Sequence, residues 1–557
     1  MNQEASNTNN EQAPENNTQQ NGYQQGYGYY QNGYPQNKYP VFKRKDLDEV
    51  MEAVSQRKSL GVVLALWVFG ILFSELFVRG GFGISVPILT VLFYGIAFVY
   101  LSAKNEKIPT SAYILLLPIM LISFGYLLSD SPMTYFVNTL VLLVLIPVQL
   151  SRMSNTAAGS VFSMGSAYHT MVSTLSRTFN FLDVPFKAIS KNLGKGRKGS
   201  KAAMVVIGLI IALPIAAIFI SLFIGADSTF RYFVNLIIEN IRISVGNIFF
   251  DVILGSILAI LFSSWFITMY ARKKPEPKEF SLKTGLDVTL VSTVLVVINL
   301  IQIAFVSIQF GYLFSGSQLP GGMSVVEYAR SGFFELCGVI GFTVFIIMLV
   351  MVFVKRNEQR KLPGVVSGLL SILILCNYVV IASAVFRMLK YIEAQDLTIK
   401  RVMVLWLIGV FAITLFGAFI KLWVPKFKTG SYVAIVVILM TVLINYVNVN
   451  GAIAQYNVQS YINSIHDENI EQTRDINVEY LMKLGPSAAE QTARLLREAT
   501  DPDVVQKARN TLAHQKYLLL QKSWRNFCLS DIKAAEVFRA EGVQDQYYSN
   551  YNEEYYP

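Results

Sequence analysis

The feature that most constrains this chain is a series of eleven long apolar stretches separated by polar loops. Each stretch approaches or exceeds the ~20 residues that a helix needs to cross a hydrocarbon core. In a chain of 557 residues that is 53% hydrophobic and 15% charged, such stretches exclude an ordinary soluble protein. The sequence therefore predicts an all-α, polytopic transmembrane helix bundle of about eleven spans, at residues 60–78, 83–102, 111–128, 133–150, 203–225, 247–270, 285–308, 332–354, 364–386, 401–424 and 431–449.

Lys and Arg are distributed unevenly between alternate loops. One set of loops, together with the N-terminal approach, holds 28 of them, and the other set holds 8. Cytoplasmic loops carry the excess of basic residues, so we expect a cytoplasmic N-terminus. An odd number of spans then places the C-terminus on the extracytoplasmic side. The exception is loop 387–401, which carries four basic residues on the outer side.

Polar segments flank and divide the spans. The N-terminal segment is rich in Asn, Gln and Tyr, and such a composition cannot bury enough apolar area to offset its ordering entropy. The pair Asp501-Pro502 is a helix start signal in the polar C-terminal part. The predicted organisation is a disordered cytoplasmic tail (1–42), a charged juxtamembrane helix (43–59), four spans (60–150), a cytoplasmic amphipathic helix with a basic loop (151–202), seven spans (203–449), an extracytoplasmic helical domain (450–541) and a disordered tail (542–557).

An apolar stripe runs through residues 161–189 at steps of three and four, which is typical of an amphipathic helix. Pro185 should interrupt this helix. The basic segment Lys191 to Lys201 follows it, so residues 160–201 have the composition of a helix that lies on anionic lipid. The alternative is a helix that packs under the bundle as ordinary core.

No recognised catalytic signature is present, and no cofactor or metal site is predicted. The sequence lacks GxxxxGK[ST], HExxH, GxSxG and CxxC. Three isolated cysteines provide no disulfide framework. The basic residues lie mainly between apolar spans, so the bilayer is the expected partner and nucleic acid is not. The sequence identifies no particular protein partner, so possible protein partners are unknown.

Polar residues inside or beside the spans are the candidate functional residues, because intramembrane polarity is costly and usually faces a protein interior or a water-filled cavity. Asn299, Gln302 and Gln309 fall on one side of a helix and form a candidate intramembrane stripe. The predicted topology gathers an outer polar cluster of Glu75, Arg79, Asp251, Glu327, Tyr328, Arg330, Glu335, Arg387 and Tyr391. In the structural alternative, the outer charges form ion pairs or extend to water, and the stripe bonds neighbouring helices.

Several short motifs occur in order in the second half of the chain. They are Tyr328-Ala329-Arg330, Gly332 to Leu336, Tyr391-Ile392, Leu397-Thr398 with Arg401, and Ile453 to Asn457. Through them the chain resembles an uncharacterised bacterial family of polytopic membrane proteins, known only as a domain of unknown function. Asn450-Gly451 stands where that family often has Asn-Pro-Asp, which is a departure. The resemblance covers about residues 200–557. It implies a multi-pass protein of the bacterial cytoplasmic membrane and brings no activity with it.

Three classes of function fit these features. The first is a non-catalytic sensor or scaffold, which the tails, the cytoplasmic helix and the outer domain favour. The second is a transporter or lipid flippase with an outer polar site, although the two halves show no matching broken helices. The third is a membrane enzyme that acts on a lipid-linked substrate, with Glu327 or Glu335 as acid or base. The sequence favours a protein that is not an enzyme.

Overall fold

The elements below all belong to one compact unit, residues 43–557. The computed structural model describes residues 44–55, 57–102, 108–128, 130–156, 162, 164–193, 245–271, 285–314, 333–357, 361–466 and 474–543, with isolated positions between 205 and 231.

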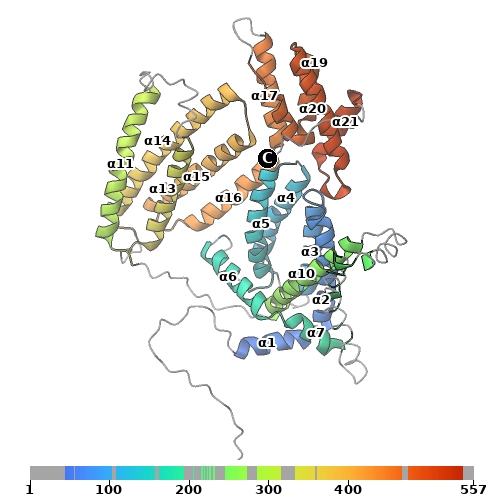
Figure 1. Cartoon of the computed structure of the whole chain (residues 1–557). Coiled ribbons are helices and arrows are strands. Elements are labelled where there is room, and N and C mark those ends of the chain that lie inside the picture. Colours follow the sequence, from blue (N-terminus) through green and yellow to red (C-terminus); the bar gives the residue numbers. More distant parts are fainter. Residues whose placement is uncertain are drawn as a thin grey trace, which may run out of the picture. The chain divides into compact units, whose positions relative to one another are not determined.

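All regular elements in the described ranges are helices (Figure 1), and this confirms the all-α class. Helices form because a bilayer offers backbone groups no water, so each segment must satisfy its own hydrogen bonds. Eight of these helices are long and apolar enough to cross a membrane, which confirms a multi-pass membrane protein: Lys58–Val78, Ser85–Ser102, Pro132–Met153, Phe250–Ala271, Val288–Gln309, Phe333–Phe353, Gly364–Gln395 and Ile399–Trp423.

Three of the eleven predicted spans need a separate account. The span predicted at 111–128 is a shorter apolar helix, Ala112–Leu128. The span predicted at 431–449 belongs to a pair of helices, Thr429–Asn445 and Val449–His466, that meet at a bend of 60° and make a ninth candidate span if counted together. The span predicted at 203–225 lies almost wholly outside the described residues.

The helices are labelled as in Figure 1. Helix α1 (Arg44–Ser55) precedes the first span, which consists of α2 (Arg57–Phe73) and the π-helical turn η1 (Ser74–Val78). The other elements up to the bend are α3 (Ser85–Ser102), α4 (Thr110–Leu128), α5 (Pro132–Met153), α6 (Met164–Asn180), α7 (Val184–Leu193), α10 (Val245–Ala271), α11 (Val288–Phe314), α13 (Phe333–Phe353), α14 (Gly364–Gln395), α15 (Ile399–Trp423) and α16 (Thr429–Asn445).

Helices α2 and α10 cross so closely that their backbones are in contact. At the crossing, a Cβ atom on Gly70 would clash with the backbone carbonyl of Gly255, and one on Gly255 would lie 2.6 Å from the backbone nitrogen of Ile71. Small residues let membrane helices approach at backbone distance. Beside the crossing, the indole of Trp67 donates to the Ser256 hydroxyl at 3.1 Å, and the rings of Phe69 and Phe262 pack edge to face.

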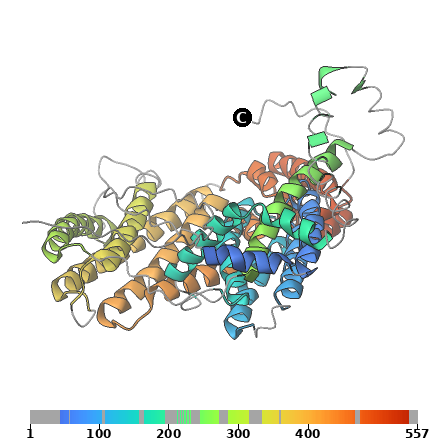
Figure 2. The same ribbon diagram turned by 90° about the horizontal axis from the view of Figure 1, so that it is seen from below.

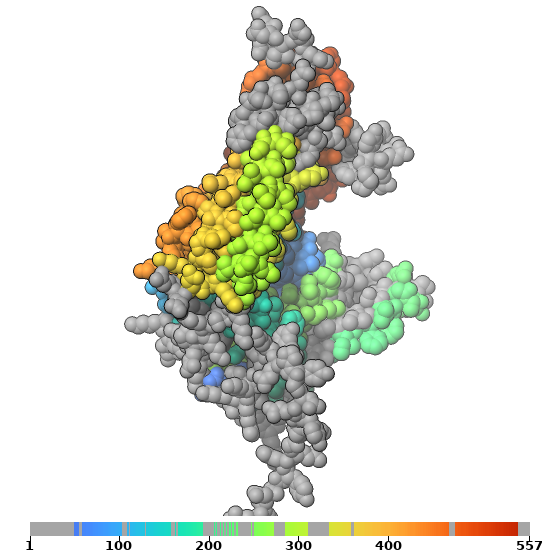
Figure 3. Space-filling view, turned by 90° about the vertical axis from the view of Figure 1, so that its left-hand side faces the viewer, coloured from blue at the N-terminus to red at the C-terminus, as the bar shows by residue number. Residues whose placement is uncertain are grey.

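Helices α11, α13, α14 and α15 form a second group around their own apolar core (Figure 2). The core takes Leu370, Leu373 and Ile374 from α14, all fully buried. Helix α11 lies at the periphery and covers one face of this group in Figure 3. Its apolar side chains remain exposed, for example Leu300 at 63% and Ile301 at 65%, as expected of a helix that faces lipid.

The amphipathic segment divides into two helices. Helix α6 ends at Asn180 and α7 begins at Val184, so Pro185 stands in the first turn of α7, where a proline is tolerated. The interruption that Pro185 predicts is therefore present. Both helices pack against α10, where the Ser264 hydroxyl donates to the backbone carbonyls of Thr178 and Phe181.

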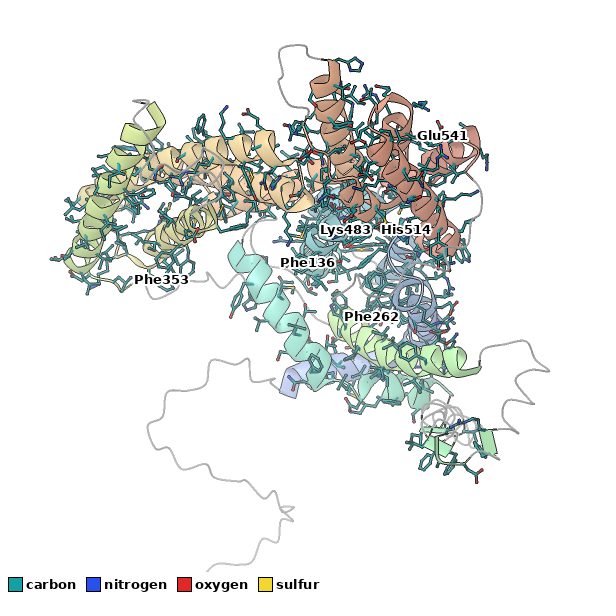
Figure 4. The ribbon with its side chains drawn as sticks, turned by 45° about the horizontal axis from the view of Figure 1, so that its top comes forward. Phe136, Phe262, Phe353, Lys483, His514 and Glu541 are labelled. Carbon is teal, nitrogen blue, oxygen red and sulfur yellow. The ribbon has the colours of Figure 1, made fainter. Side chains whose placement is uncertain are left out.

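The C-terminal domain consists of α17 (Val449–His466), α18 (Val478–Lys483), η3 (Gly485–Ala488), α19 (Ala489–Glu498), α20 (Pro502–Gln521), η4 (Trp524–Asn526) and α21 (Leu529–Ala540). Helix α20 begins as the Asp-Pro pair predicts, because the Asp501 side chain accepts from the backbone of Asp503 at 2.9 Å. Figure 4 marks Lys483 on α18 and His514 on α20. Two small apolar cores hold the domain together, with Leu481 and Leu495 in the first and Leu512 and Phe538 in the second.

Candidate functional site at the docking interface of the C-terminal domain

The connection between α20 and α21, residues 522–528, is called the docking segment here. It contacts η1, the residues before α3, the end of α4 and the start of α5. A cap fixes its exit into α21, because the Asp531 side chain accepts from the backbone of Cys528 at 2.8 Å. The backbone amide of Ile84 donates to the carbonyl of Phe527 at 3.1 Å. We call the contacts of residues 522–528, with Asp531, the docking interface.

Four charges at the docking interface form one neutral network. Arg525 is paired with Glu75 and also donates to the backbone carbonyl of Glu75 at 3.2 Å. Arg79 bridges Glu75 at 2.8 Å and Asp251 at 2.5 Å. Asp251 accepts a further bond from the Ser74 hydroxyl at 2.7 Å, and only 6% of its side chain is exposed. Two carboxylates thus meet two guanidinium groups, which offsets the cost of burying them.

Lys522, three residues before Arg525 in the docking segment, is the centre of a second ion cluster. The ammonium group of Lys522 lies 2.7 Å from Asp130, in the loop between α4 and α5, and 2.9 Å from Asp531. Burial lowers the pKa of Lys522, but the two carboxylates raise it by more, so the net pKa lies above its ordinary value of 10.5. Lys522 therefore stays charged at neutral pH and neutralises Asp531, whose side chain is 1% exposed.

Backbone contact at the docking interface is close enough to require glycine. Gly83 has φ of 140°, and a Cβ atom there would lie 2.6 to 2.9 Å from backbone atoms of Asn526. Beside it, Cys528 is fully buried, with its sulfur 3.4 Å from the Tyr135 hydroxyl. Burial raises the pKa of the Cys528 thiol to about 11. Access of a reagent to Cys528 therefore reports whether the segment is docked.

The predicted polar stripe on α11 forms interhelical hydrogen bonds. The Asn299 amide donates to the backbone carbonyl of Leu369 at 3.1 Å, and that of Gln302 donates to the Thr343 hydroxyl at 2.9 Å. The Gln309 carbonyl accepts from Arg387, at 2.9 Å. The stripe thus joins α11 to α13 and α14, as the structural alternative predicts.

Three of the four basic residues in the predicted loop 387–401 have local partners. Arg387 and Lys390 belong to the last turns of α14, where Arg387 is buried and donates to Gln309 and Lys390 pairs with Glu393 at 2.8 Å. The guanidinium of Arg401 lies 4.0 Å from the centre of the Tyr391 ring, a cation–π contact. Lys400 is exposed.

The described members of the predicted outer cluster lie in separate parts of the structure. Glu75, Arg79 and Asp251 meet at the docking interface, whereas Arg387 and Tyr391 belong to the second group of helices. Among the described residues, no hydrogen bond or ion pair joins these two sets. Glu335 is exposed in the first turn of α13. Glu327, Tyr328 and Arg330 lie outside the described residues.

Sequence reasoning missed Arg525, Lys522, Asp130 and Asp531, which lie in polar segments where charges are ordinary. It also missed an amide pair that the intramembrane polarity rule could have found. Asn138 of α5 and Asn445 of α16 are buried and donate to each other at 2.6 and 2.7 Å. In the part of the chain that the structure describes, no group of three His, Cys, Asp or Glu side chains is arranged to hold a metal.

We expect Asn138→Leu to destabilise the protein by about 1–2 kcal/mol, because it leaves the Asn445 amide without its partner in an apolar interior. The double variant Asn138→Leu/Asn445→Leu should recover most of this loss, since both polar groups are then removed. The measurement is thermal unfolding of the purified protein in detergent. A double variant whose loss equals the sum of the two single losses would contradict the reciprocal bond.

Asn457 of the Ile453–Asn457 motif, and Asn450 just before that motif, have structural partners. Asn457 bonds both backbone groups of Leu397, accepting from its amide at 2.7 Å and donating to its carbonyl at 3.0 Å. Asn450 donates to the backbone carbonyls of Asp130 at 2.6 Å and Leu484 at 3.1 Å. The motif thus fixes α17 to the loop before α15 and to the loop between α4 and α5.

The family whose description is "Domain of unknown function (DUF4153)" matches residues 116–495, more than half of the chain. No curated protein matches the chain, and no solved structure matches it either.

Proposed function

Because the chain belongs to the DUF4153 family, whose description assigns no activity, we propose a function from its geometry: a non-catalytic bacterial membrane protein of the sensor or scaffold type. The observation that carries the proposal is the docking interface, in which Arg525 and Lys522 hold the C-terminal domain on the ends of the membrane helices. In this proposal the domain lies outside the cytoplasmic membrane and the N-terminus inside, as the distribution of Lys and Arg favours.

The ion pairs of Glu75 and Asp251 argue against an acid or base role for these two carboxylates. A general acid or base must exchange its proton with a substrate. Asp251 is instead held by Ser74 and Arg79, and Glu75 by Arg79 and Arg525. This arrangement is typical of charges that hold elements together.

The transporter alternative also lacks support from the site geometry. The side-chain amide nitrogens of Asn299 and Gln302 donate interhelical hydrogen bonds, and Glu335 lies on an exposed face. A cavity of about 360 Å³ beside Ile392 and Leu405 is mostly apolar, and none of the three polar residues lines it. A transport site at the midplane would instead present polar groups to a cavity.

A continuous path of packed elements supports a sensory role. Arg525 holds η1 at the domain end of the first span. The span then crosses α10 at Gly70 and Gly255, where the backbones touch. At the far end, α2 and α10 pack on α1 and α7, and Asn192 of α7 donates to the backbone of Val54 at 3.0 Å. A movement of the domain can therefore be transmitted to the helices at the opposite end of the span. Such coupling requires that one of the packed elements has two alternative conformations.

We infer that α6 contacts the inner leaflet. Its face toward the bundle carries small polar residues, with Thr170 and Thr178 buried, while Tyr168, Leu175 and Phe179 are 53–62% exposed. An exposed apolar stripe, followed in the sequence by the basic segment 191–201, has the composition of a segment that binds anionic lipid. The helix thus packs under the bundle by one face and offers the other to lipid.

A charge exchange between Glu75 and Arg525 tests the proposal. In a background with Cys337→Ala and Cys376→Ala, Cys528 is the only thiol. We expect Glu75→Gln and Arg525→Gln each to raise the rate at which a membrane-impermeant maleimide labels Cys528 in intact cells, by about tenfold for each 1.4 kcal/mol of docking free energy lost. The pair Glu75→Arg/Arg525→Glu should restore protection and complement a deletion strain.

The control is Lys507→Met, which removes an exposed pair with Asp503 and should leave the labelling rate unchanged. If Glu75→Gln abolishes complementation while Cys528 stays protected, Glu75 has a chemical role and the non-catalytic proposal is wrong. Labelling that occurs only after the cells are permeabilised would contradict the extracytoplasmic placement.

A further inference from the structure

Five large apolar side chains are exposed in the C-terminal domain, and all of them lie in or next to the docking segment. In the part of the domain that the structure describes, residues 449–466 and 474–543, no other large apolar side chain is exposed. We call these five the apolar rim: Tyr517, Leu520, Trp524, Leu529 and Ile532. Single apolar residues on a surface are ordinary, but a set that is confined to one end of a domain marks an interaction site.

The polarity of the exposed side chains changes along both helices that meet at the docking segment. The first half of α20 exposes Lys507 and Arg509 and no large apolar side chain, whereas its last turn exposes Leu520. In α21 the order is reversed, with Ile532 exposed in the first turn and Glu536 farther along. Both helices thus become apolar toward the docking segment, as expected where a protein passes from water into the surface of a membrane.

The docking segment lies at the level where the membrane helices end. Arg525 donates to the backbone carbonyl of Glu75, three residues before the end of the first span. The Cys528 sulfur lies 3.5 Å from the backbone carbonyl oxygen of Tyr126, two residues before the end of α4. These contacts are only about 3–5 Å along the helices from their ends. The hydrocarbon core is ~30 Å thick and the bilayer with its headgroups ~40–45 Å, so the docking segment lies in or beside the headgroup layer.

The residues of the apolar rim suit this level of the membrane. Trp524 is 63% exposed and is the chain neighbour of Arg525, so its backbone is held at the same level. Trp524 and Tyr517 each combine an apolar ring with a polar group, and such side chains are enriched where hydrocarbon meets headgroups. Leu520, which is 62% exposed, adds aliphatic area beside them. Lipid is therefore the occupant that both the position and the chemistry of the rim favour.

We propose that the apolar rim inserts into the lipid leaflet on the domain's side of the membrane, so that lipid is a direct partner of the C-terminal domain. The domain is then held both by the ion pairs of the docking interface and by lipid. The rim reaches the leaflet only while the domain is docked, and lipid therefore stabilises the docked state. This inference goes beyond the sensor assignment, and it applies on whichever side of the membrane the domain lies.

The first experiment measures the fluorescence of Trp524 in the full-length protein, reconstituted into phosphatidylcholine vesicles with or without bromine atoms on the acyl chains. The chain has five tryptophans, so the emission of Trp524 is taken as the difference between the parent protein and Trp524→Phe. Brominated lipid should remove most of this difference, because bromine quenches only the rings that it contacts. A difference that bromine leaves unchanged overturns the proposal.

A spin label measures the depth of the same position independently. The label is attached to Trp524→Cys in a background in which the three native cysteines are replaced by alanine. The control is Lys507→Cys, whose parent side chain is 52% exposed and which lies about 20 Å along α20 from Leu520. The ratio of collisions with oxygen to collisions with a water-soluble nickel chelate should be several-fold higher for the label at Trp524→Cys. Equal ratios overturn the proposal, and so does dipolar broadening between labels, which would show that a second copy of the chain covers the rim.

Loss of the lipid contact should also weaken docking. With Cys337→Ala and Cys376→Ala in place, we expect Trp524→Ser to raise the rate of maleimide labelling of Cys528 in vesicles about tenfold, which corresponds to ~1.4 kcal/mol. The control is Trp423→Ser, which removes a tryptophan of similar exposure, 64%, from the end of α15 and should leave the rate unchanged. Equal labelling rates for the two variants would mean that lipid does not hold the domain, and the proposal would be wrong.

The lipid contact and the docking interface fail separately. If bromine does not quench Trp524 while Cys528 stays protected in the parent protein, the lipid contact is refuted and the docking is not. Rapid labelling of Cys528 in the parent protein would refute the docking itself, and with it the position of the rim at the membrane.

Discussion

Replacing Lys522 with methionine is expected to cost about 3–5 kcal/mol of docking free energy, because it leaves the buried carboxylate of Asp531 without its counter-ion. The substitution keeps much of the apolar stem and removes only the charge. Cys528 should then become reactive to maleimide at neutral pH, and the rate of its modification measures the loss. A Cys528 thiol as well protected as in the parent protein would contradict the assignment of Lys522.

The size of this effect is set by burial. Lys522 is 14% exposed and Asp531 1%, whereas Lys507 and Asp503 are 52% and 67% exposed. An exposed pair contributes about 0–1 kcal/mol, so Lys507→Met is the matched control. Asp531→Asn in the Lys522→Met background should recover part of the loss, since an asparagine oxygen can still accept from the backbone of Cys528.

The pKa of Lys522 determines how this contribution depends on pH. Because the pKa is raised in the folded state, the stability that Lys522 provides is fully present below the ordinary value of 10.5. It is lost only as the pH rises through the folded-state pKa. Around neutral pH, titration of Lys522 should therefore not change the free energy of docking.

Replacing Gly70 with valine is expected to destabilise the protein by about 3 kcal/mol, at the upper end of what overpacking usually costs. The reason is that the new Cβ atom meets the backbone of Gly255, which cannot move aside as a side chain can. Thermal unfolding in detergent measures the loss, and labelling of Cys528 shows whether the damage reaches the docking interface.

The control for this substitution lies in the same helix. A Cβ atom on Gly61 meets nothing within 4 Å, so Gly61→Val imposes the same β-branched side chain on α2 without a clash. We expect the free energy of unfolding of Gly61→Val to lie within about 0.5 kcal/mol of that of the parent protein. Equal losses for the two variants would mean that α2 and α10 do not touch at Gly70.

Much of the fold follows from local features of the sequence. The long apolar stretches predict the spans because backbone groups in lipid must bond within their own helix. The step of three and four residues predicts α6 and α7, with Pro185 at the break. Asp501-Pro502 predicts the start of α20, since a cap needs only residues that are neighbours along the chain.

The candidate site could be predicted only in part. Polarity beside the spans selects Glu75, Arg79 and Asp251, and the structure brings these three together. It does not select Arg525, which lies 450 residues from Glu75 in a polar segment. The bend at Asn445–Val449 was not predicted either, because the sequence predicts the end of the span near this point but not the 60° change of direction with which α17 continues.

The sequence by itself determined that this protein is an all-α multi-pass membrane protein, because crossing lipid is a property of each segment taken alone. Only the tertiary structure decided what its charges do. Whether Glu75 is a free carboxylate or the partner of Arg525 depends on how α20 and α21 pack on the membrane helices. The free energy of a buried charge depends on its neighbours in space, and no segment of the chain carries that information alone.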